Sequence, residues 1–513
     1  MSEISRRDFL KFTSILAAGA LLHGSLSRLK DEAIPNIIII LFDAMSARNL
    51  SLYGYPRKTS PFLEQFAEQA TVYHQHYSGG NFTTPGTACM LTGMNQWKHR
   101  AFDIGGLIKS DLAPINPFTL LGKDYFRLMF AQNLYADRLV GQFAGDVDRF
   151  LPMTSFSFRK NNLVPDKVGK DRYLASVAFD EFLLPLQTGI PASSVFGYIY
   201  KSVILRTILG HENHDGYPRG VPEAENFFNY LNEDVYQGVL SEILDLEQQP
   251  KPYFSYFHLF SPHSPYKPGK AFSKLFENDG YSPPHKPMHP YTPGFTDDDL
   301  LEKRLRYDQQ VAHVDAEFGK VIDQLDAHGV LEHSYVIATS DHGELFERGF
   351  FGHSGPLLYE AVVHIPLLIH APGQKTRQDI HGRTSNIDLL PTLLSAAGKN
   401  IPASVDGRLL PGFGGVEDDE RPLFSMNAIE NSEFLPLTKA AISMHKGQYK
   451  LIAYLGYEEM ESPYELYDLE SDPEEFDNLA ETDSAVFARM KDEFLSHLAD
   501  ANRPYLKNKQ PGG

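Results

Sequence analysis

The sequence predicts a doubly wound α/β fold: a mostly parallel sheet flanked by helices, with a smaller α+β subdomain at the C-terminus. Two observations predict it. The run from Asn36 to Phe42 is continuously apolar and rich in β-branched residues, which is typical of a parallel strand buried on both faces. Further strand-like runs alternate with segments whose apolar residues repeat at helical spacing, as in a parallel sheet covered by helices.

The remaining elements follow from local signals along the chain. Ser60 can cap a helix that has Pro61 in its first turn. Apolar residues at helical spacing predict a long helix over residues 303–328, which Gly329 ends. Apolar and aromatic runs predict further strands at residues 253–259, 334–340, 365–370, 449–454 and 465–469.

The pattern changes along the chain in a way that suggests domain limits. We expect the α/β domain to span residues 34–402 and the subdomain to span residues 403–513. Residues 140–235 are rich in Phe, Pro and Lys without clear βα alternation, so they are predicted to be an insertion that shapes a cleft. Residues 268–298 are rich in Pro and His and should form an irregular surface loop.

Composition narrows the class of protein. The 513 residues are 42% hydrophobic and 22% charged, as in an ordinary soluble globular protein. A formal charge of −19 would be repelled by phosphate backbones, so nucleic acid is not expected as a partner. Cys89 is the single cysteine, which excludes an intrachain disulfide and a Cys-based zinc site.

The N-terminus predicts export. Arg6 and Arg7 precede a short apolar run over residues 12–22, the pattern of a twin-arginine signal over residues 1–30. The export machinery would then carry the folded protein across the cytoplasmic membrane to the periplasm or the exterior. The run is shorter than the ~20 residues of a spanning helix, and no Ala-x-Ala site precedes Ile34, so an uncleaved tether is an alternative. An exposed amphipathic helix is the other interpretation.

Three side chains at strand ends predict a metal site. Asp43 directly follows the first strand, and Asp341 and His342 directly follow a later one. Ligands of open α/β sheets bind at the carboxyl ends of strands. Carboxylates with an imidazole suit Mn²⁺ or Zn²⁺ better than Ca²⁺, with Mg²⁺ a further candidate. The plainer interpretation of Asp43 is a helix cap.

A hydroxyl at a helix start predicts a nucleophile. The segment Thr83-Thr84-Pro85-Gly86 opens a predicted helix, whose unsatisfied N–H groups and dipole favour an anion such as phosphate or sulfate. A threonine hydroxyl on a divalent cation also loses its proton more easily, so Thr83 is the candidate nucleophile and a further metal ligand. An ordinary threonine N-cap is the alternative.

Three histidines are candidates for roles near the site. His263, between two prolines at a strand end, and His353, in a Gly-His-Ser-Gly segment, are candidates for protonating a leaving group or binding an oxyanion. His258 lies within the preceding strand, where a structural role is expected first and substrate binding second.

These segments, taken in order, resemble the sulfatase family of the alkaline phosphatase superfamily over residues 36–479. The resemblance places Thr83 at the nucleophile position, and Asp43, Asp341 and His342 at metal-ligand positions. It also implies the alkaline phosphatase/sulfatase fold. The strings that carry it are Leu91-Thr92-Gly93 after the nucleophile, His258 to Tyr266, Ser340 to Glu344, Asp388 to Leu394 and Glu465 to Pro473.

The sequence departs from that family at four positions. Sulfatases oxidise a Cys or Ser to formylglycine where this chain has Thr83, which cannot form that aldehyde. Thr87 replaces the motif's arginine, and Ala44 replaces a second aspartate. The usual Lys-x-His is missing, and Asn133, near where it would lie, is a candidate substrate-binding residue.

The resemblance with these departures predicts a metal-dependent ester hydrolase. A threonine nucleophile resembles superfamily members that act on phosphorus, so we expect hydrolysis of phosphate mono- or diesters, or phosphotransfer, through a covalent threonine intermediate. The partner would be an anionic ester, with glycan- and lipid-linked esters as candidates. The alternatives are a sulfatase that works without formylglycine and an inactive relative that binds glycans or cell-wall polymers.

Overall fold

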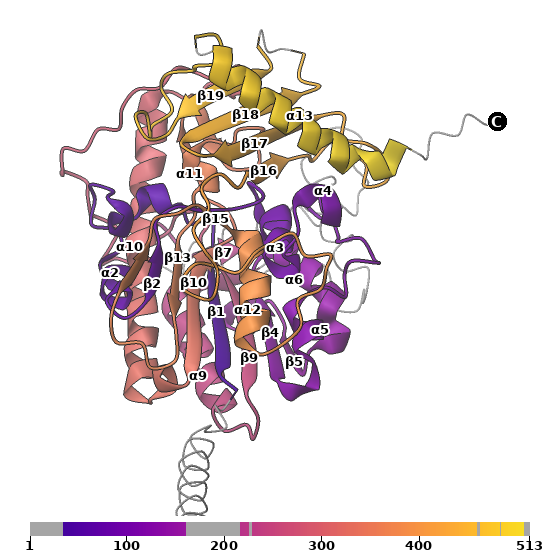
Figure 1. Cartoon of the computed structure of the whole chain (residues 1–513). Helices are drawn as coiled ribbons and strands as arrows, with labels where there is room; N and C mark the ends of the chain where they lie inside the picture. The colour runs from indigo at the N-terminus through magenta and orange to yellow at the C-terminus, as the bar shows by residue number, and fades with distance from the viewer. Residues whose placement is uncertain (1–33, 161–215, 225–227, 459–461, 483, 507–513) are drawn as a thin grey trace, which may run out of the picture. The chain divides into compact units, whose positions relative to one another are not determined.

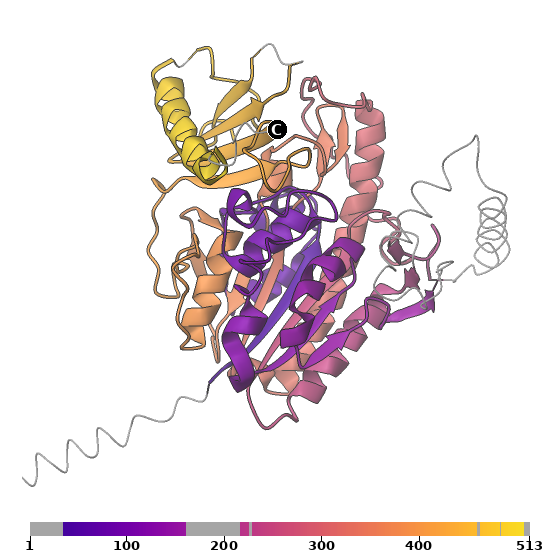
Figure 2. The same cartoon turned by 90° about the vertical axis from the view of Figure 1, so that its right-hand side faces the viewer.

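The computed structural model describes residues 34–160, 216–224, 228–458, 462–482 and 484–506 (Figures 1 and 2). The predicted export signal, residues 1–30, and most of the predicted insertion, residues 140–235, lie outside these residues. Within the described ranges, no helix is long and apolar enough to cross a membrane.

The central element is a mixed, mostly parallel sheet of eight strands, which confirms the predicted fold class. Five neighbouring strand pairs run parallel, and the antiparallel pairs both involve β13. From one edge to the other the strands are β14 (Gln378–Ile380), β2 (Thr71–Tyr73), β13 (Leu367–His370), β10 (Ser334–Ser340), β1 (Asn36–Asp43), β9 (Tyr253–Pro262), β4 (Phe126–Ala131) and β5 (Arg149–Leu151).

Helices cover both faces of this sheet, as the apolar first strand predicts. Alternate residues of β1 enter opposite cores: Ile38 and Ile40 pack on one side, and Ile37 and Ile39 pack on the other. The first side is covered by α2 (Pro61–Ala67), α9 (Asn232–Leu246) and α10 (Asp297–Ala327). The second side is covered by α3 (Thr83–Thr92), α5 (Pro117–Leu121), α6 (Leu134–Val140) and α12 (Leu389–Ala396).

The ends of the predicted insertion belong to this α/β layer. Strand β5 pairs in parallel with β4 at the sheet edge, and α9 begins at Asn232. Strand β5 has only three residues, and one of its side chains is exposed, so its periodicity carries too little signal to be recognised in the sequence.

Helix α2 begins where the sequence predicts, but its cap comes from elsewhere. The Ser60 side chain makes no capping hydrogen bond to the helix. The Asp315 carboxylate of α10 accepts hydrogen bonds from the backbone N–H groups of Phe62 and Leu63, both at 2.8 Å. A tertiary contact therefore supplies the cap, and a local pattern cannot reveal it.

The C-terminal region forms a second, antiparallel sheet with one long helix packed on it. Figures 1 and 2 place it beyond the carboxyl ends of the parallel strands. Its elements are β16 (Leu423–Asn427), β17 (Ala440–Lys446), β18 (Tyr449–Leu455), β19 (Tyr464–Asp468) and α13 (Ser484–Leu506). The shorter elements include α4 (Gln96–His99), α11 (Glu360–Val363) and the hairpin of β11 (Leu345–Glu347) and β12 (Phe350–Gly352). Shorter pairings join β3 (His76–Tyr77) to β15 (Thr384–Ser385), and β6 (Ser157–Lys160) and β7 (Glu223–Ala224) to β8 (Phe228–Tyr230).

A buried charge cluster joins α11 to the second sheet. Lys450 Nζ lies 3.0 Å from Glu360 Oε1 and 2.8 Å from Glu475 Oε1, and His445 Nε2 lies 2.8 Å from Glu360 Oε1. Burial favours the neutral form of Glu360, but Lys450 and His445 hold its pKa well below the usual range. These charges are stable only as a set, because each would be costly to bury alone.

Replacement of Lys450 tests this joint. Lys450→Met leaves two buried carboxylates without their cation, so we expect the free energy of unfolding to fall by about 3–5 kcal/mol. Lys446→Met is the matched control, since Lys446 pairs with Glu493 where both side chains are about a quarter exposed; its loss should stay below about 1 kcal/mol. Denaturant unfolding of both variants measures the difference, and equal losses would contradict this role of Lys450.

Candidate metal centre and nucleophile

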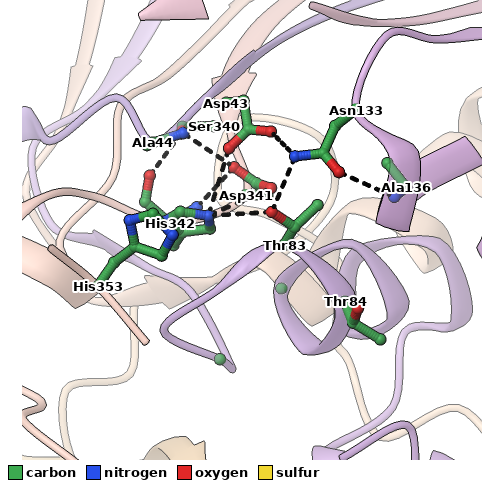
Figure 3. A network of polar contacts seen from close by, with 12 residues as sticks. Asp43, Ala44, Thr83, Thr84, Asn133, Ala136, Ser340, Asp341, His342 and His353 are labelled. Atoms are coloured by element: carbon green, nitrogen blue, oxygen red, sulfur yellow. Dashed lines mark hydrogen bonds and ion pairs between the residues drawn. The ribbon is translucent and has the colours of Figure 1, made fainter. Parts of the chain in front are cut away.

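Adjacent strands bring the predicted metal ligands together. Asp43 ends β1, Asp341 and His342 follow the neighbouring β10, and Thr83 is the first residue of α3. All four are buried, and their side chains point toward one another (Figure 3). The two Asp residues and His342 are close enough to hold one metal ion together.

Each carboxylate has one oxygen engaged by the protein and one free. Asp341 Oδ1 accepts hydrogen bonds from the backbone N–H groups of Ala44 at 3.3 Å and His342 at 3.0 Å. Asp43 Oδ2 accepts from Asn133 Nδ2 at 2.6 Å. Within the part of the chain that the structure describes, the buried atoms Asp43 Oδ1 and Asp341 Oδ2 have no hydrogen-bond partner. A buried carboxylate oxygen without a hydrogen-bond donor is costly, and a bound cation would offset that cost.

His342 presents a lone pair to the same place. Its Nδ1 lies 2.9 Å from the carbonyl oxygen of Gly343, which only accepts, so Nδ1 carries a proton and Nε2 is the nitrogen left to bind a cation. Nε2 lies 3.4 Å from Asp43 Oδ1 and 3.6 Å from Asp341 Oδ2. Burial lowers the pKa of His342, but the two carboxylates outweigh it and raise that pKa to about 9. The pocket therefore attracts positive charge.

The nucleophile position lies against these ligands. Thr83 Oγ1 is 3.4 Å from His342 Nε2 and 3.4 Å from Asn133 Nδ2. Gly86 permits this approach, because a Cβ there would lie 2.3 Å from the carbonyl oxygen of Asp341. Thr83 is not the N-cap of α3, a position that Phe82 takes, so its hydroxyl is not used for capping.

The donor set fits a divalent transition metal. Asp43 Oδ1, Asp341 Oδ2 and Thr83 Oγ1 lie 3.4–3.6 Å from His342 Nε2. Ligand atoms roughly 3.3–3.6 Å apart are the edges of a tetrahedron around a cation about 2.0–2.2 Å from each. An imidazole among so few oxygen ligands favours Zn²⁺ or Mn²⁺ over Ca²⁺.

Asn133 and His258 lie behind the metal ligands. Asn133 caps α6: its Oδ1 accepts from the N–H groups of Tyr135 and Ala136, while its Nδ2 faces Asp43. Both of its polar ends are thus engaged inside the protein, and its predicted substrate contact stays a prediction. His258 Nε2 lies 3.3 Å from Asp43 Oδ2, so the residue belongs to the metal centre's surroundings.

The two other predicted histidines lie next to His342. The ring of His353 is centred 4.3 Å from that of His342 and 5.0 Å from that of His263. His353 Nδ1 lies 2.9 Å from Glu344 Oε1, and Tyr266 OH donates to Glu344 Oε2 at 2.9 Å. Glu344 was not predicted as a site residue, although it ends the Ser340 to Glu344 string, because the string does not show that it points at His353.

Burial sets the charge state of His263. Its pKa is lowered chiefly by burial and also by the charge of His353, while Asp43 opposes the shift. Nδ1 donates to the Ser264 carbonyl oxygen at 2.7 Å, so Nε2 of the neutral ring accepts.

Comparison with known proteins identifies the family. The sulfatase family profile matches residues 35–144 and 169–399, and the profile described as N-sulphoglucosamine sulphohydrolase, C-terminal, matches residues 347–501. The chain therefore belongs to the sulfatase family, a group of ester hydrolases in the alkaline phosphatase superfamily.

The names of individual relatives cover more than one class of ester. Choline-sulfatase of Rhizobium meliloti (strain 1021) is 24% identical over 500 residues, 90% of this chain and 86% of that protein. Arylsulfatase K of Xenopus laevis is 29% identical over 273 residues, 46% of this chain, and the match spans only 49% of that protein. The structure of the phosphonate monoester hydrolase of Agrobacterium radiobacter superposes with a TM-score of 0.64 at 18% identity, covering 91% of this chain and 96% of that one.

Metal binding at this centre can be measured without any substrate. Zn²⁺ or Mn²⁺ added to metal-free protein at 100 times its Kd should stabilise the fold by about 2.7 kcal/mol. Asp341→Asn should abolish that stabilisation, because it removes one of the two free carboxylate oxygens. Asp315→Asn, which alters the buried carboxylate at α2, should leave it intact. Thermal unfolding with and without metal measures this stabilisation. If Asp341→Asn were still stabilised by the metal, the ion would bind elsewhere.

Proposed function

We propose that this protein hydrolyses phosphate mono- or diesters with Thr83 as nucleophile and one divalent cation as cofactor. One observation carries the proposal. Thr83 Oγ1 and the free oxygens Asp43 Oδ1 and Asp341 Oδ2 all lie 3.4–3.6 Å from His342 Nε2. A cation held by these atoms lowers the pKa of the hydroxyl and offsets charge on the transferred group.

The first half-reaction uses two side chains. Thr83 Oγ1, its proton released to solvent, attacks phosphorus, and the bond to the leaving oxygen breaks. His353 supplies the proton that this oxygen needs, since Glu344 engages Nδ1 and leaves Nε2 for the substrate. The product of this step is a phosphothreonine and a released alcohol.

The second half-reaction regenerates the nucleophile. Water attacks the phosphothreonine and the bond from phosphorus to Thr83 Oγ1 breaks; inorganic phosphate leaves when the substrate is a monoester, and a phosphate monoester leaves when it is a diester. Neutral His263, whose Nε2 accepts, is suited to take the proton of that water. An acceptor alcohol in place of water would make the same chemistry a phosphotransfer.

The identity of the nucleophile favours phosphorus over sulfur. A threonine cannot become the aldehyde whose hydrate releases sulfate, and a threonine–sulfate ester lacks that route of breakdown. Cys89 is no substitute, because it is buried six positions further along the chain and burial raises the pKa of its thiol.

A sulfatase that works without formylglycine is the second candidate. It is favoured by the match to choline-sulfatase, which extends over 90% of this chain. Export to the periplasm or exterior, predicted from residues 1–30, is compatible with either activity.

Replacement of the nucleophile separates these candidates. Thr83→Ala should lower turnover of p-nitrophenyl phosphate mono- or diesters by at least about 10³-fold, because it removes the hydroxyl that lies 3.4 Å from His342 Nε2. Thr84→Ala is the matched control, since the Thr84 hydroxyl bonds to the Ile104 carbonyl oxygen instead. Turnover is measured on phosphate and sulfate esters, with metal-free and reconstituted protein.

The outcomes distinguish the mechanisms. Metal-dependent phosphoester turnover lost only in Thr83→Ala supports the proposal. Full turnover by Thr83→Ala would exclude the threonine mechanism, and faster turnover of the sulfate ester would establish the second candidate.

The role of His353 predicts a dependence on the leaving group. His353→Ala should slow an alkyl or phenyl ester by about 10²–10⁴-fold but a p-nitrophenyl ester far less, because nitrophenolate needs no proton to leave. Glu344→Gln should shift activity in the same direction. The control is His333→Ala, which breaks a comparable His–Glu contact (2.9 Å to Glu247) at the other end of β10. An equal loss on both esters would contradict proton donation by His353.

A further inference from the structure

Two buried histidines point Nε2 at the same pair of carboxylates, but the partners of their Nδ1 atoms differ. His342 holds a proton on Nδ1, as the Gly343 carbonyl oxygen requires, so Nε2, which faces the carboxylates, is the nitrogen that can bind a cation. His258 also points Nε2 at them, 3.3 Å from Asp43 Oδ2 and 3.6 Å from Asp341 Oδ2. Its Nδ1 is not bonded to a carbonyl group but lies 3.1 Å from the hydroxyl of Tyr256.

The acceptors around His258 decide where its proton lies. An ionised carboxylate only accepts, so the contact with Asp43 Oδ2 is favourable when Nε2 carries a proton. Nδ1 of the neutral ring then accepts a hydrogen bond from the Tyr256 hydroxyl. Burial, together with the charges of Asp341 and Asp43, raises the pKa of Tyr256 well above its usual value, so the phenol keeps that proton.

The Asp43 carboxylate is thereby divided between protein and cation. Oδ2 lies against two donors, Asn133 Nδ2 at 2.6 Å and His258 Nε2 at 3.3 Å. Oδ1 has no hydrogen-bond partner among the described residues and faces His342. Ala44, which directly follows, offers the site only its backbone N–H, bonded to Asp341 Oδ1. Asp43 is thus the one residue at the end of β1 whose side chain can bind the cation, so cation binding depends on the orientation of its carboxylate.

We infer that His258 is a positioning residue that holds Asp43 for the cation, with Tyr256 fixing its tautomer, and that it is not itself a metal ligand. The inference rests on the metal-dependent function proposed above. Neighbouring strands build the arrangement: His258 of β9 pairs in register with Leu41 of β1, two residues before Asp43, and with Ala131 of β4, two residues before Asn133. Donors behind a ligating carboxylate orient it and tune its basicity, and their loss typically costs 10–100-fold in metal affinity.

Metal affinity and the spectrum of bound Co²⁺ test the inference together. His258→Leu removes the donor and should weaken Zn²⁺ binding by about 10–100-fold in competition with a chromophoric chelator. His258→Gln keeps an N–H donor and should recover most of that loss. Tyr256→Phe removes one hydroxyl and should weaken binding by less than His258→Leu. In His258→Gln the ligand-field bands of Co²⁺ should match the wild type, because no ligand has changed.

A buried histidine outside the site provides the matched control. His370 of β13 is fully buried, and its ring nitrogens face the backbone carbonyl oxygens of Gln69 and Leu331 instead of the metal site, so His370→Leu should leave Zn²⁺ affinity unchanged. Wild-type affinity in both His258→Leu and Tyr256→Phe would overturn the inference, and so would altered Co²⁺ bands in His258→Gln, which would make His258 a ligand. If the wild-type protein binds no divalent ion, the proposed metal-dependent function is wrong, and the inference that rests on it falls too. If the wild type binds the ion but the variants bind it equally well, only the role of His258 is wrong. Should His258→Leu not fold, Tyr256→Phe and His258→Gln still decide.

Discussion

The structure depends on the burial of two carboxylates at the ends of adjacent parallel strands. Asp43 and Asp341 are fully buried, and each leaves one oxygen without a protein partner. Burial and the charge of Asp43 raise the pKa of Asp341, while His263, His258 and His342 hold that of Asp43 below its usual range. A fold that keeps two such groups together needs positive charge between them. The surrounding histidines and N–H donors contact these carboxylates, and the start of α3 lies beside them.

Packing elsewhere holds this arrangement in place. Helix α3 approaches the loop after β10 so closely that only glycine fits at position 86, and Asn386 Nδ2 donates to the Gly86 carbonyl oxygen from the other side at 3.0 Å. The second sheet is joined to α11 through the buried Lys450 cluster. The hydroxyl of Thr83 is thus positioned by contacts from the sheet, the helix layer and the loop before α12.

Departures from the family pattern have a common consequence in this chain. Ala44 stands where a second aspartate would add a carboxylate, which leaves a small ligand set beside a threonine hydroxyl, and Asn133 donates to Asp43 from behind. A set of two carboxylates, one imidazole and one hydroxyl suits a compact transition metal, because it offers too few oxygens for Ca²⁺. Under the proposed mechanism, the choice of nucleophile and the metal preference are linked properties of one site.

The sequence by itself determined the fold class, the main strands and the three residues of the candidate metal site. Strand β1 reads as buried on both faces because its apolar run is continuous, and Asp43, Asp341 and His342 stand at strand ends where ligands of such sheets bind. Tertiary structure alone decided which atoms meet: Asp315 caps α2, Glu344 turns to His353, and His258 faces Asp43. These contacts join residues on different elements, some more than 200 positions apart. Hydrophobic periodicity and local motifs report a residue's neighbours along the chain, whereas the direction of a buried polar side chain depends on the elements packed against it.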